Sequence, residues 1–337
     1  MKKHVSLKDL ANELGVSIST VSRALKNHPD ISPEVCDKIQ ILAKERKYSP
    51  NPLAMGLLKR QTRTIGVIVP DIVTHFYSSI INGIEDEAEK KGYYVVVTSS
   101  NESYEKEKHC IQNLMNLRVE GIITCISQDT NDYSHFDTVL ENEIPLVFFD
   151  RVCRTSEFSS IVVNNIEASR QITNHFFQTG SKRIAHIAGP ANLNISKERI
   201  EGYKLGLEDC NLPFDESLLV YSNLDLSSAT FAAKKLLDLP YPPDAVFGVN
   251  DTVVFAAMKE IKKRGIRIPQ DISLVGFTDD FHASFVEPSL TSIEHPTYEM
   301  GSKAAQLLLR QLGNEAVAAP SQIVVNTKLI IRESSVK

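Results

Sequence analysis

From residue 64 onward, short apolar segments alternate with longer segments of helical periodicity. Continuous apolar strands joined through helices are typical of a parallel sheet that is covered on both faces. The strands are too numerous for one comfortable sheet. The pattern therefore predicts two α/β lobes with a cleft between them and a first break near residues 161–165. The apolar segments are 65–69, 94–98, 121–126, 146–149, 161–163, 184–188, 218–221, 245–249 and 273–277.

Two short helical patterns separated by a glycine precede this region. The first begins at Ser6, with an acidic residue at capping-box spacing, and ends at Gly15. The second covers residues 17–25 and begins with Ser17 as N-cap. A third pattern, which opens with Pro33 in its first turn, completes a small core. The spacing predicts a helix-turn-helix, although a small helical domain that binds no DNA could carry the same signals.

The charge of the chain is divided unevenly. Residues 1–63 hold 12 Lys and Arg against 6 Asp and Glu, whereas the remaining residues hold 25 against 36. A basic N-terminal region on an acidic body is expected when only the first part contacts phosphate. A solvated charged surface is the alternative explanation.

The segment that joins the two regions has its own helix signals. Asn51 can act as N-cap with Pro52 at the first helical position. The candidate helix is short and contains Gly56, so it should be marginal in isolation. We interpret it as a hinge that folds only with outside help, with a plain linker as the alternative.

Several features bear on the compartment. The five cysteines are scattered and form no CxxC pair, which fits reduced thiols rather than a disulfide framework or a metal site. A basic N-terminus is followed by an amphipathic helix instead of an apolar signal, and no segment is long and apolar enough to span a membrane. We therefore expect a cytoplasmic protein with no membrane partner and no metal.

Several segments together resemble the LacI/GalR family of bacterial transcription regulators. The resemblance covers nearly the whole chain and is most specific in the N-terminal region. Its segments are residues 5–11, 15–17, 19–23, 51–57 and 64–71, followed by 199–203, 249–251, 275–277 and 290–293.

The resemblance implies a homodimer with three parts in each subunit. These are a helix-turn-helix headpiece (1–49), a hinge (50–63) and a two-lobed core (64–337). The core would be α/β, with two Rossmann-like lobes in the architecture of type I periplasmic binding proteins. Its first lobe would hold about 64–162 and 294–318, and its second about 163–293 and 319–337. The chain would cross between lobes near 161–164, 290–294 and 319–323.

The resemblance also places the DNA contacts. Ile18, Ser19 and Arg23 correspond to positions that contact base edges, and an arginine can bind guanine bidentately. Leu57 corresponds to a leucine that wedges into the minor groove. Ser6, Ser17, Thr20 and Ser22 are expected to contact phosphates of a pseudo-palindromic operator.

The effector site is expected where strand C-termini of the two lobes face each other. An aromatic face with arginine and aspartate partners suits a sugar. Alternatively, Arg199 and Asp251 could simply pair with each other. The matching positions are Phe76, Ser127 and Asp150 in the first lobe and Asn194, Arg199, Leu224, Asp251 and Asp279 in the second.

The interpretation is therefore a sequence-specific repressor of carbohydrate-utilisation genes whose operator affinity is switched through the hinge by a sugar-like effector. A purine- or nucleoside-responsive member, or one coregulated by a phosphoprotein, is the alternative. An enzyme is disfavoured because the chain has no GxSxG, HExxH or Gly-rich phosphate loop, and no cofactor is expected. A sugar-binding receptor that does not bind DNA fits the core but not the basic headpiece.

Overall fold

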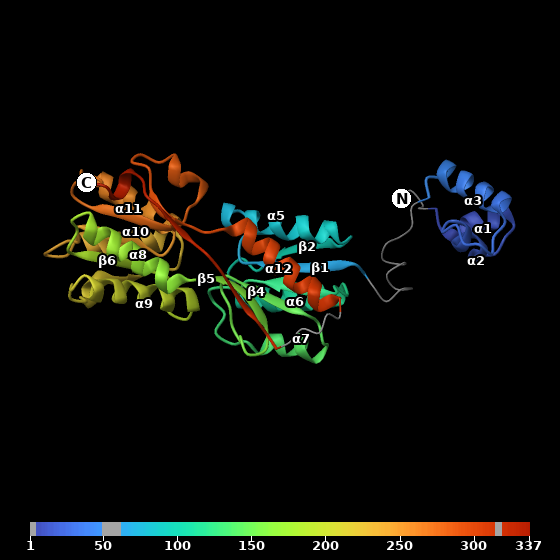
Figure 1. Ribbon diagram of the computed structural model, residues 1–337, viewed down its shortest axis with the longest axis horizontal. Helices are drawn as coiled ribbons and strands as arrows, with labels where there is room; N and C mark the ends of the chain where they lie inside the picture. The colour runs from blue at the N-terminus through green and yellow to red at the C-terminus, as the bar shows by residue number, and fades with distance from the viewer. Residues whose placement is uncertain (1–4, 49–61, 314–318) are drawn as a thin grey trace. The chain divides into compact units, whose positions relative to one another are not determined.

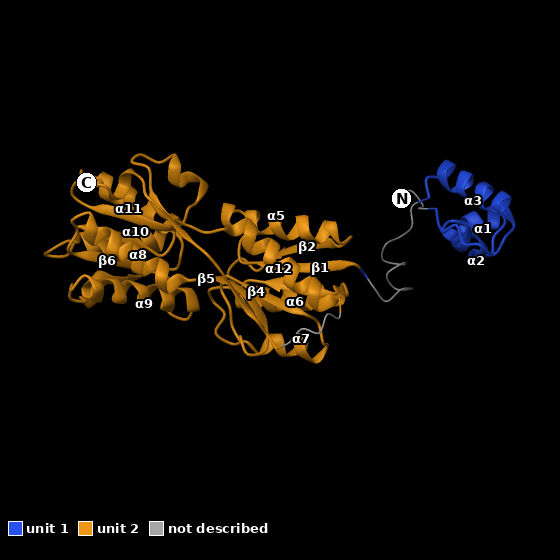
Figure 2. Cartoon of the chain, viewed as in Figure 1, with its two compact units in different colours: residues 1–62 blue, residues 63–337 orange. Residues whose placement is uncertain are grey.

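The computed structural model describes residues 5–48, 62–313 and 319–337. The chain divides into two compact units, Met1–Thr62 and Arg63–Lys337 (Figure 2). Most of the predicted hinge, including Leu57, lies outside the described residues.

In residues 5–48, the described part of the first unit, three short helices form a bundle. Ser6 starts the first through a reciprocal capping box, in which its Oγ accepts from the Asp9 N–H at 3.2 Å and its own N–H donates to the Asp9 carboxylate at 2.9 Å. Gly15 ends this helix at a φ of 63°, a left-handed conformation that costs glycine little. The helices are α1 (Leu7–Leu14), α2 (Ile18–Ala24) and α3 (Pro33–Glu45).

The second unit contains two six-stranded sheets, as the alternating pattern predicts (Figure 1). The first has the order β11-β5-β4-β3-β1-β2, and all of its pairs are parallel. Its strands are Val- and Ile-rich because helices cover both faces. They are β1 (Thr64–Val69), β2 (Tyr94–Ser99), β3 (Gly121–Thr124), β4 (Leu146–Phe149), β5 (Ser159–Val163) and β11 (Gln322–Val325).

The second sheet has the order β12-β10-β9-β8-β6-β7, and only β12 pairs antiparallel. It forms the second lobe. Its strands are β6 (Ile184–Ala188), β7 (Leu219–Tyr221), β8 (Ala245–Gly248), β9 (Ser273–Thr278), β10 (Thr291–Glu294) and β12 (Lys328–Ile330).

Helices cover each sheet on both faces. In the first lobe, α5 and α12 cover one face and α6 and α7 the other, and in the second lobe α8 and α9 lie opposite α10 and α11. Gly83 and Gly301 let α5 and α12 approach closely, because a Cβ on either would lie within 2.2 Å of a backbone oxygen of the other helix. The helices are α5 (His75–Lys90), α6 (Tyr104–Asn116), α7 (Asp137–Glu141), α8 (Asn165–Gln178), α9 (Asn194–Asp209), α10 (Leu226–Leu237), α11 (Asp251–Lys263) and α12 (Thr297–Leu312).

The third crossing between the lobes differs from the expectation. We expected residues 319–337 to belong wholly to the second lobe, with the crossing near 319–323. Instead β11 extends the first sheet beside β5, and the chain crosses only before β12. The family resemblance implied the second lobe for the whole tail, whereas residues 322–325 pair with the free edge of β5 in the first sheet.

The two lobes share apolar packing. One continuous cluster of buried residues joins Phe149 and Val163 of the first sheet to Phe277 and Ile293 of the second. In addition, Leu193 and Ile195, next to the start of α9 in the second lobe, belong to an apolar cluster of the first lobe. The lobes are therefore joined by side chains as well as by chain crossings.

Candidate functional site

Helix α2 has one buried face and one exposed face. Val21 and Ala24 are fully buried against the other two helices, and Ser17 caps the helix by accepting from the Thr20 N–H at 3.1 Å. On the other face, Ile18 is 48% exposed and the Arg23 side chain 55% exposed. This face presents an apolar group and a cation on a short helix, a combination that suits base edges in the major groove.

The hydroxyl groups predicted to contact DNA already make local hydrogen bonds. Ser17 Oγ lies 2.7 Å from Ser19 Oγ and 2.8 Å from Thr20 Oγ1, and Ser6 Oγ donates to Asp9 at 2.7 Å. Arg23 is held only weakly, since its guanidinium lies 3.9 Å from Asp30 and both side chains are largely exposed. Arg23 is therefore available to an outside partner at little cost.

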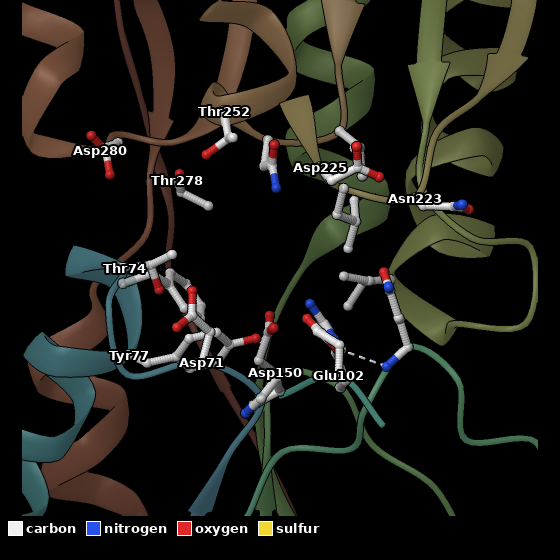
Figure 3. Close-up of a pocket in the computed structure, with 18 of the residues that line it drawn as sticks. Asp71, Thr74, Tyr77, Glu102, Asp150, Asn223, Asp225, Thr252, Thr278 and Asp280 are labelled. Carbon is white, nitrogen blue, oxygen red and sulfur yellow. Dashed lines mark hydrogen bonds and ion pairs between the residues drawn. The ribbon is translucent and has the colours of Figure 1, made fainter. Parts of the chain in front are cut away.

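A cleft with a cavity volume of about 480 Å³ lies between the two lobes of the second unit. Figure 3 shows the two walls facing each other, with Asp71, Thr74, Tyr77, Glu102 and Asp150 on one side and Asn223, Asp225, Thr252, Thr278 and Asp280 on the other. Its size is typical of a small-molecule site. Parallel strands end at the same edge of each sheet, so the loops after these strands form the walls.

Four of the eight predicted effector residues line this cleft, namely Phe76, Asp150, Arg199 and Leu224. The Phe76 ring makes edge contacts with Tyr77 and His295, each at 5.0 Å between ring centroids, so its orientation is fixed by its neighbours.

The structure places the other four behind the walls. Ser127 is buried and donates from its backbone N–H to Glu107 at 2.5 Å and from its hydroxyl to Ser100 at 2.7 Å. Asp279 is occupied by a two-pronged ion pair with Arg332, its shorter arm 2.6 Å long.

Asn194 joins the lobes, because its Oδ1 accepts from the backbone N–H of Val152 at 3.2 Å. It occupies the junction beside the cleft and is absent from the lining.

Asp251 supports the wall from behind. It begins α11 and accepts from Ser292 Oγ and from the Asp280 N–H, each at 2.6 Å. Only a glycine fits beside it, since a Cβ on Gly276 would lie 1.9 Å from Asp251 Oδ1. Burial raises the pKa of Asp251 to about 7.

Arg199 is the largest fully buried side chain of the site. Its Nε donates to Asn165 at 2.9 Å, Nη1 donates to the Val249 carbonyl, and its guanidinium lies 3.7 Å from the centroid of the Phe277 ring. Its hydrogen bonds are thus made to these groups and not to Asp251. Burial lowers its pKa to about 10, which leaves the group charged at neutral pH.

Asp150 presents an unshared carboxylate at the floor of the cleft (Figure 3). Its side chain is 6% exposed, and within the described residues its carboxylate has no hydrogen-bond partner, the His295 ring nitrogen being 3.8 Å away. Burial raises its pKa, while the nearby Arg199 and Arg151 oppose that shift. A buried carboxylate without a partner is costly, so a hydroxyl donor from a ligand would stabilise it.

His295 is a functional candidate that the sequence analysis missed. It lies on the second crossing between the lobes, and neither ring nitrogen has a hydrogen-bond partner in the described part of the chain. Its ring lies between Phe76 and Phe277, and burial lowers its pKa well below the ordinary value.

Several residues that line the cleft have a left-handed backbone conformation. Asp150, Leu224 and Thr278 line it with φ values of 58°, 63° and 118°, in the region that non-glycine residues rarely adopt. Such conformations persist only where the surroundings enforce them, and they cluster at ligand sites. A bulky leucine and a β-branched threonine in this region mark the loops as built for binding.

Most of the missed cleft residues share a simple signal. They lie within the first four residues after a strand, which is where parallel strands present side chains to a ligand. They include Asp71 after β1, Asn101 and Glu102 after β2, Gln128 after β3, Arg151 after β4, Asn223 and Asp225 after β7, Asn250 and Thr252 after β8, and Asp280 after β9.

Among the described residues, no helix is long and apolar enough to cross a membrane. The same residues contain no group of three or more His, Cys, Asp or Glu side chains placed to hold a metal ion.

Comparison with known proteins matches parts of both units to known families of domains. The family model for bacterial regulatory proteins of the lacI family matches residues 6–51, and that for a periplasmic binding protein-like domain matches residues 173–335. The HTH-type transcriptional repressor CytR of Escherichia coli K12 is 32% identical over 333 residues, 98% of this chain and 96% of CytR. This chain belongs to the LacI family. Catabolite control protein A of Priestia megaterium is 30% identical over 93% of this chain and 94% of its own.

Solved LacI-family structures agree along the whole chain. The lac repressor dimer bound to operator and the anti-inducer ONPF has a TM-score of 0.87 at 26% identity, covering 99% of this chain and 100% of that one. The regulator CelR in complex with cellobiose has a TM-score of 0.75 at 29% identity, covering 98% and 100%. The resemblance inferred from motifs, the two-lobed α/β core and the helical headpiece are thereby confirmed. The protein is a DNA-binding transcription regulator with a ligand-binding core, in a family of regulators rather than enzymes.

Proposed function

We propose that this LacI-family member is a cytoplasmic repressor that binds a pseudo-palindromic operator as a homodimer. A sugar or related hydroxylated compound in the cleft changes its operator affinity. The observation that carries the proposal is the exposed, weakly held Arg23 on α2, in the same chain as a cleft with an unshared carboxylate on its floor. CytR and the PurR of Vibrio atlanticus carry the name repressor, and CelR was solved with cellobiose.

The exposed face of α2 supports a division of labour in DNA binding. Arg23 would bind a guanine edge and Ile18 would pack on a thymine methyl group, which together select sequence. Ser6, Ser17, Thr20 and Ser22 would fix the register on the phosphates, and Ser19 tolerates several bases. Leu57 would wedge into the minor groove from the hinge.

The coupling would run through the lobes. A ligand held by both walls of the cleft favours one relative orientation of the lobes, and this changes the spacing of the two hinges in the dimer. A coupling free energy of about 1–3 kcal/mol is usual for such systems.

The test begins with selection of operator sequences from random duplex DNA by the full-length protein. Arg23→Ala should then weaken binding to the selected site by about 10- to 100-fold and relax the preference at one base of each half-site. Lys44→Ala removes the same charge from the exposed surface of α3 and serves as the control. We expect it to lower affinity only slightly and without any change in sequence preference. Equal losses in the two variants would remove Arg23 from base recognition, and failure to enrich any sequence would refute the proposed function.

A further inference from the structure

The charged groups of the cleft form two layers. On the floor, two guanidinium groups and two carboxylates balance each other. Arg151 Nη1 donates to Glu102 at 2.8 Å, while Arg199 lies close enough to Asp150 to oppose the rise in the pKa of its carboxyl. Both arginines are almost completely buried, and their donors are partly used by protein acceptors. The floor is therefore polar but close to neutral.

Three further carboxylates line the walls of the cleft and are called the rim below. Asp71 lies on the first-lobe wall, and Asp225 and Asp280 lie on the opposite wall (Figure 3). Among the described residues that line the cleft, Arg151 and Arg199 are the only Lys or Arg. The three rim carboxylates are therefore matched by no further guanidinium or ammonium group of the lining, although Asp280 lies 2.7 Å from the exposed His282 ring.

Helix ends at the second-lobe wall do not offset this charge. Asp225 accepts from the first backbone N–H groups of α10, which together with the Ser227 hydroxyl lowers its pKa to about 2. Asn250 Oδ1 accepts from the Val253 N–H at the start of α11. The protein's own oxygens therefore already use two backbone N–H groups of α10 and one of α11, which leaves fewer donors for a phosphate at this wall.

The hydroxyl groups of a ligand, by contrast, would meet polar atoms of the cleft that have no hydrogen-bond partner. The Asp150 carboxylate has no hydrogen-bond donor in the described chain, and Gln128 Oε1 and Thr74 Oγ1 are buried atoms without a partner. All three residues line the cleft, as does Phe76. A sugar hydroxyl can both donate and accept, so it suits acceptors such as Asp150 and Gln128 as well as the Thr74 hydroxyl.

We propose that the effector is an uncharged polyhydroxy compound, a free sugar or a nucleoside, and that the cleft rejects the phosphorylated form of the same compound. This inference rests on the proposed function. A phosphate dianion would lose water on entry, find the two guanidinium groups of the cleft buried and already hydrogen-bonded to protein acceptors, and face carboxylates from both lobes. Asp71 would oppose Asp225 and Asp280 as the lobes close, so an anion between them would add to the repulsion.

Matched pairs of free and phosphorylated compounds test the inference. Full-length dimer is titrated by calorimetry, after a thermal-shift screen, with D-glucose, D-ribose, adenosine and cytidine and with glucose 6-phosphate, ribose 5-phosphate, AMP and CMP. We expect at least one free compound to bind and its phosphate to bind at least about tenfold more weakly. A phosphate that binds as tightly as its parent overturns the inference. So does the absence of binding by all four free compounds.

Two variants then connect the discrimination to the rim. Asp71→Asn and Asp280→Asn remove charge but keep an oxygen that can accept the existing backbone hydrogen bonds from Val73 and His282. Each variant should lower, several-fold, the ratio of the dissociation constant of the phosphate to that of the free compound. Asp238→Asn makes the same change at an exposed carboxylate paired with Arg264, outside the cleft lining, and should leave the ratio unchanged.

An unchanged ratio in both rim variants refutes the electrostatic explanation. Operator selection on the same preparation separates the two claims. A protein that enriches a palindromic sequence but prefers a phosphate ester keeps its proposed function and loses only this inference.

Discussion

The headpiece and the cleft obtain their functional residues in opposite ways. In the headpiece, the candidate DNA contacts from Ser17 to Arg23 are neighbours in sequence, and one short helix fixes their directions. In the cleft, the lining runs from Pro70 to Asp280 and comes from the ends of strands in both sheets. A local pattern can therefore specify the first site, whereas the second exists only after two sheets have formed and met. Damage to one should leave the other intact, which can be measured.

The largest effect is expected from Arg199→Met. The change removes a buried charge, leaves Asn165 and the Val249 carbonyl without their hydrogen-bond donor, and removes the nearby positive charge that opposes the rise in the pKa of Asp150. We expect the free energy of unfolding of the second unit to fall by about 3–5 kcal/mol. Calorimetry should show this loss while the headpiece transition stays in place. Arg170→Met, which breaks a half-exposed pair with Asp209, should cost less than about 1 kcal/mol.

Leu10→Ala tests whether the headpiece can be destabilised without an effect on the second unit. Leu10 is fully buried in a core of only a few side chains, so its truncation should cost about 3 kcal/mol. Operator binding should be lost at a temperature where ligand binding by the second unit persists. Ile18→Ala truncates an exposed side chain of the same unit and should change its stability by less than about 0.5 kcal/mol. Joint loss of both activities with Leu10→Ala would contradict the independence of the two units.

The response of stability to pH should be larger in the second unit, where two buried groups act in opposite directions. Burial lowers the pKa of His186 from 6.5 to about 3. Below pH 6.5 the unfolded chain therefore binds a proton that the folded chain does not, and the free energy of unfolding decreases as the pH decreases. Burial raises the pKa of Asp251 from 3.8 to about 7, so stability from this group rises as the pH falls from 7 towards 3.8.

Urea unfolding at several pH values separates these two groups. Relative to wild type, His186→Phe should gain about 2 kcal/mol between roughly pH 6.5 and 5, and Asp251→Asn should lose a comparable amount. The Phe side chain can retain the stacking of the imidazole on Phe247, where ring centroids lie 4.2 Å apart. Parallel pH profiles for the variants and wild type would mean that neither group keeps its shifted pKa in solution.

The smallest effect is expected at the start of α2. Ser17→Ala removes the cap that accepts from the Thr20 N–H, which should cost the headpiece about 1 kcal/mol. Ser17→Asn restores an acceptor and should recover most of the loss in a thermal denaturation of the headpiece. If the alanine variant were as stable as wild type, the hydrogen bonds among the hydroxyl groups of Ser17, Ser19 and Thr20 would not contribute to the stability of the headpiece.

The same contrast explains how far the sequence alone could go. Caps at Ser6 and Ser17 and the glycine at position 15 are local signals, and they define the headpiece helices to within a residue or so. Strand–helix alternation likewise predicted the nine strands β1–β9 and the two lobes. The tail was misassigned because pairing of β11 with β5 depends on the free edge of a sheet formed far earlier in the chain.

The cleft was predicted only in part for a similar reason. Phe76, Asp150, Arg199 and Leu224 were placed correctly at the cleft, but whether a polar group meets a ligand or another side chain depends on partners distant in sequence. Asp279 is taken up by Arg332, 53 residues later, and that pair leaves no trace in local spacing. His295 was missed because neither its burial nor its lack of partners can be inferred from a single position.

The side chains shared between the lobes restrict how the effector can move them. Leu193 and Ile195 stay seated among first-lobe residues, and the cluster from Phe149 to Phe277 is continuous. Separating the lobes completely would expose this apolar interface to water, so the permitted motion is a small rotation or a small translation along the interface. If a protease cleaved all three segments that cross between the lobes, we therefore expect the two lobes to stay associated and still to bind the ligand.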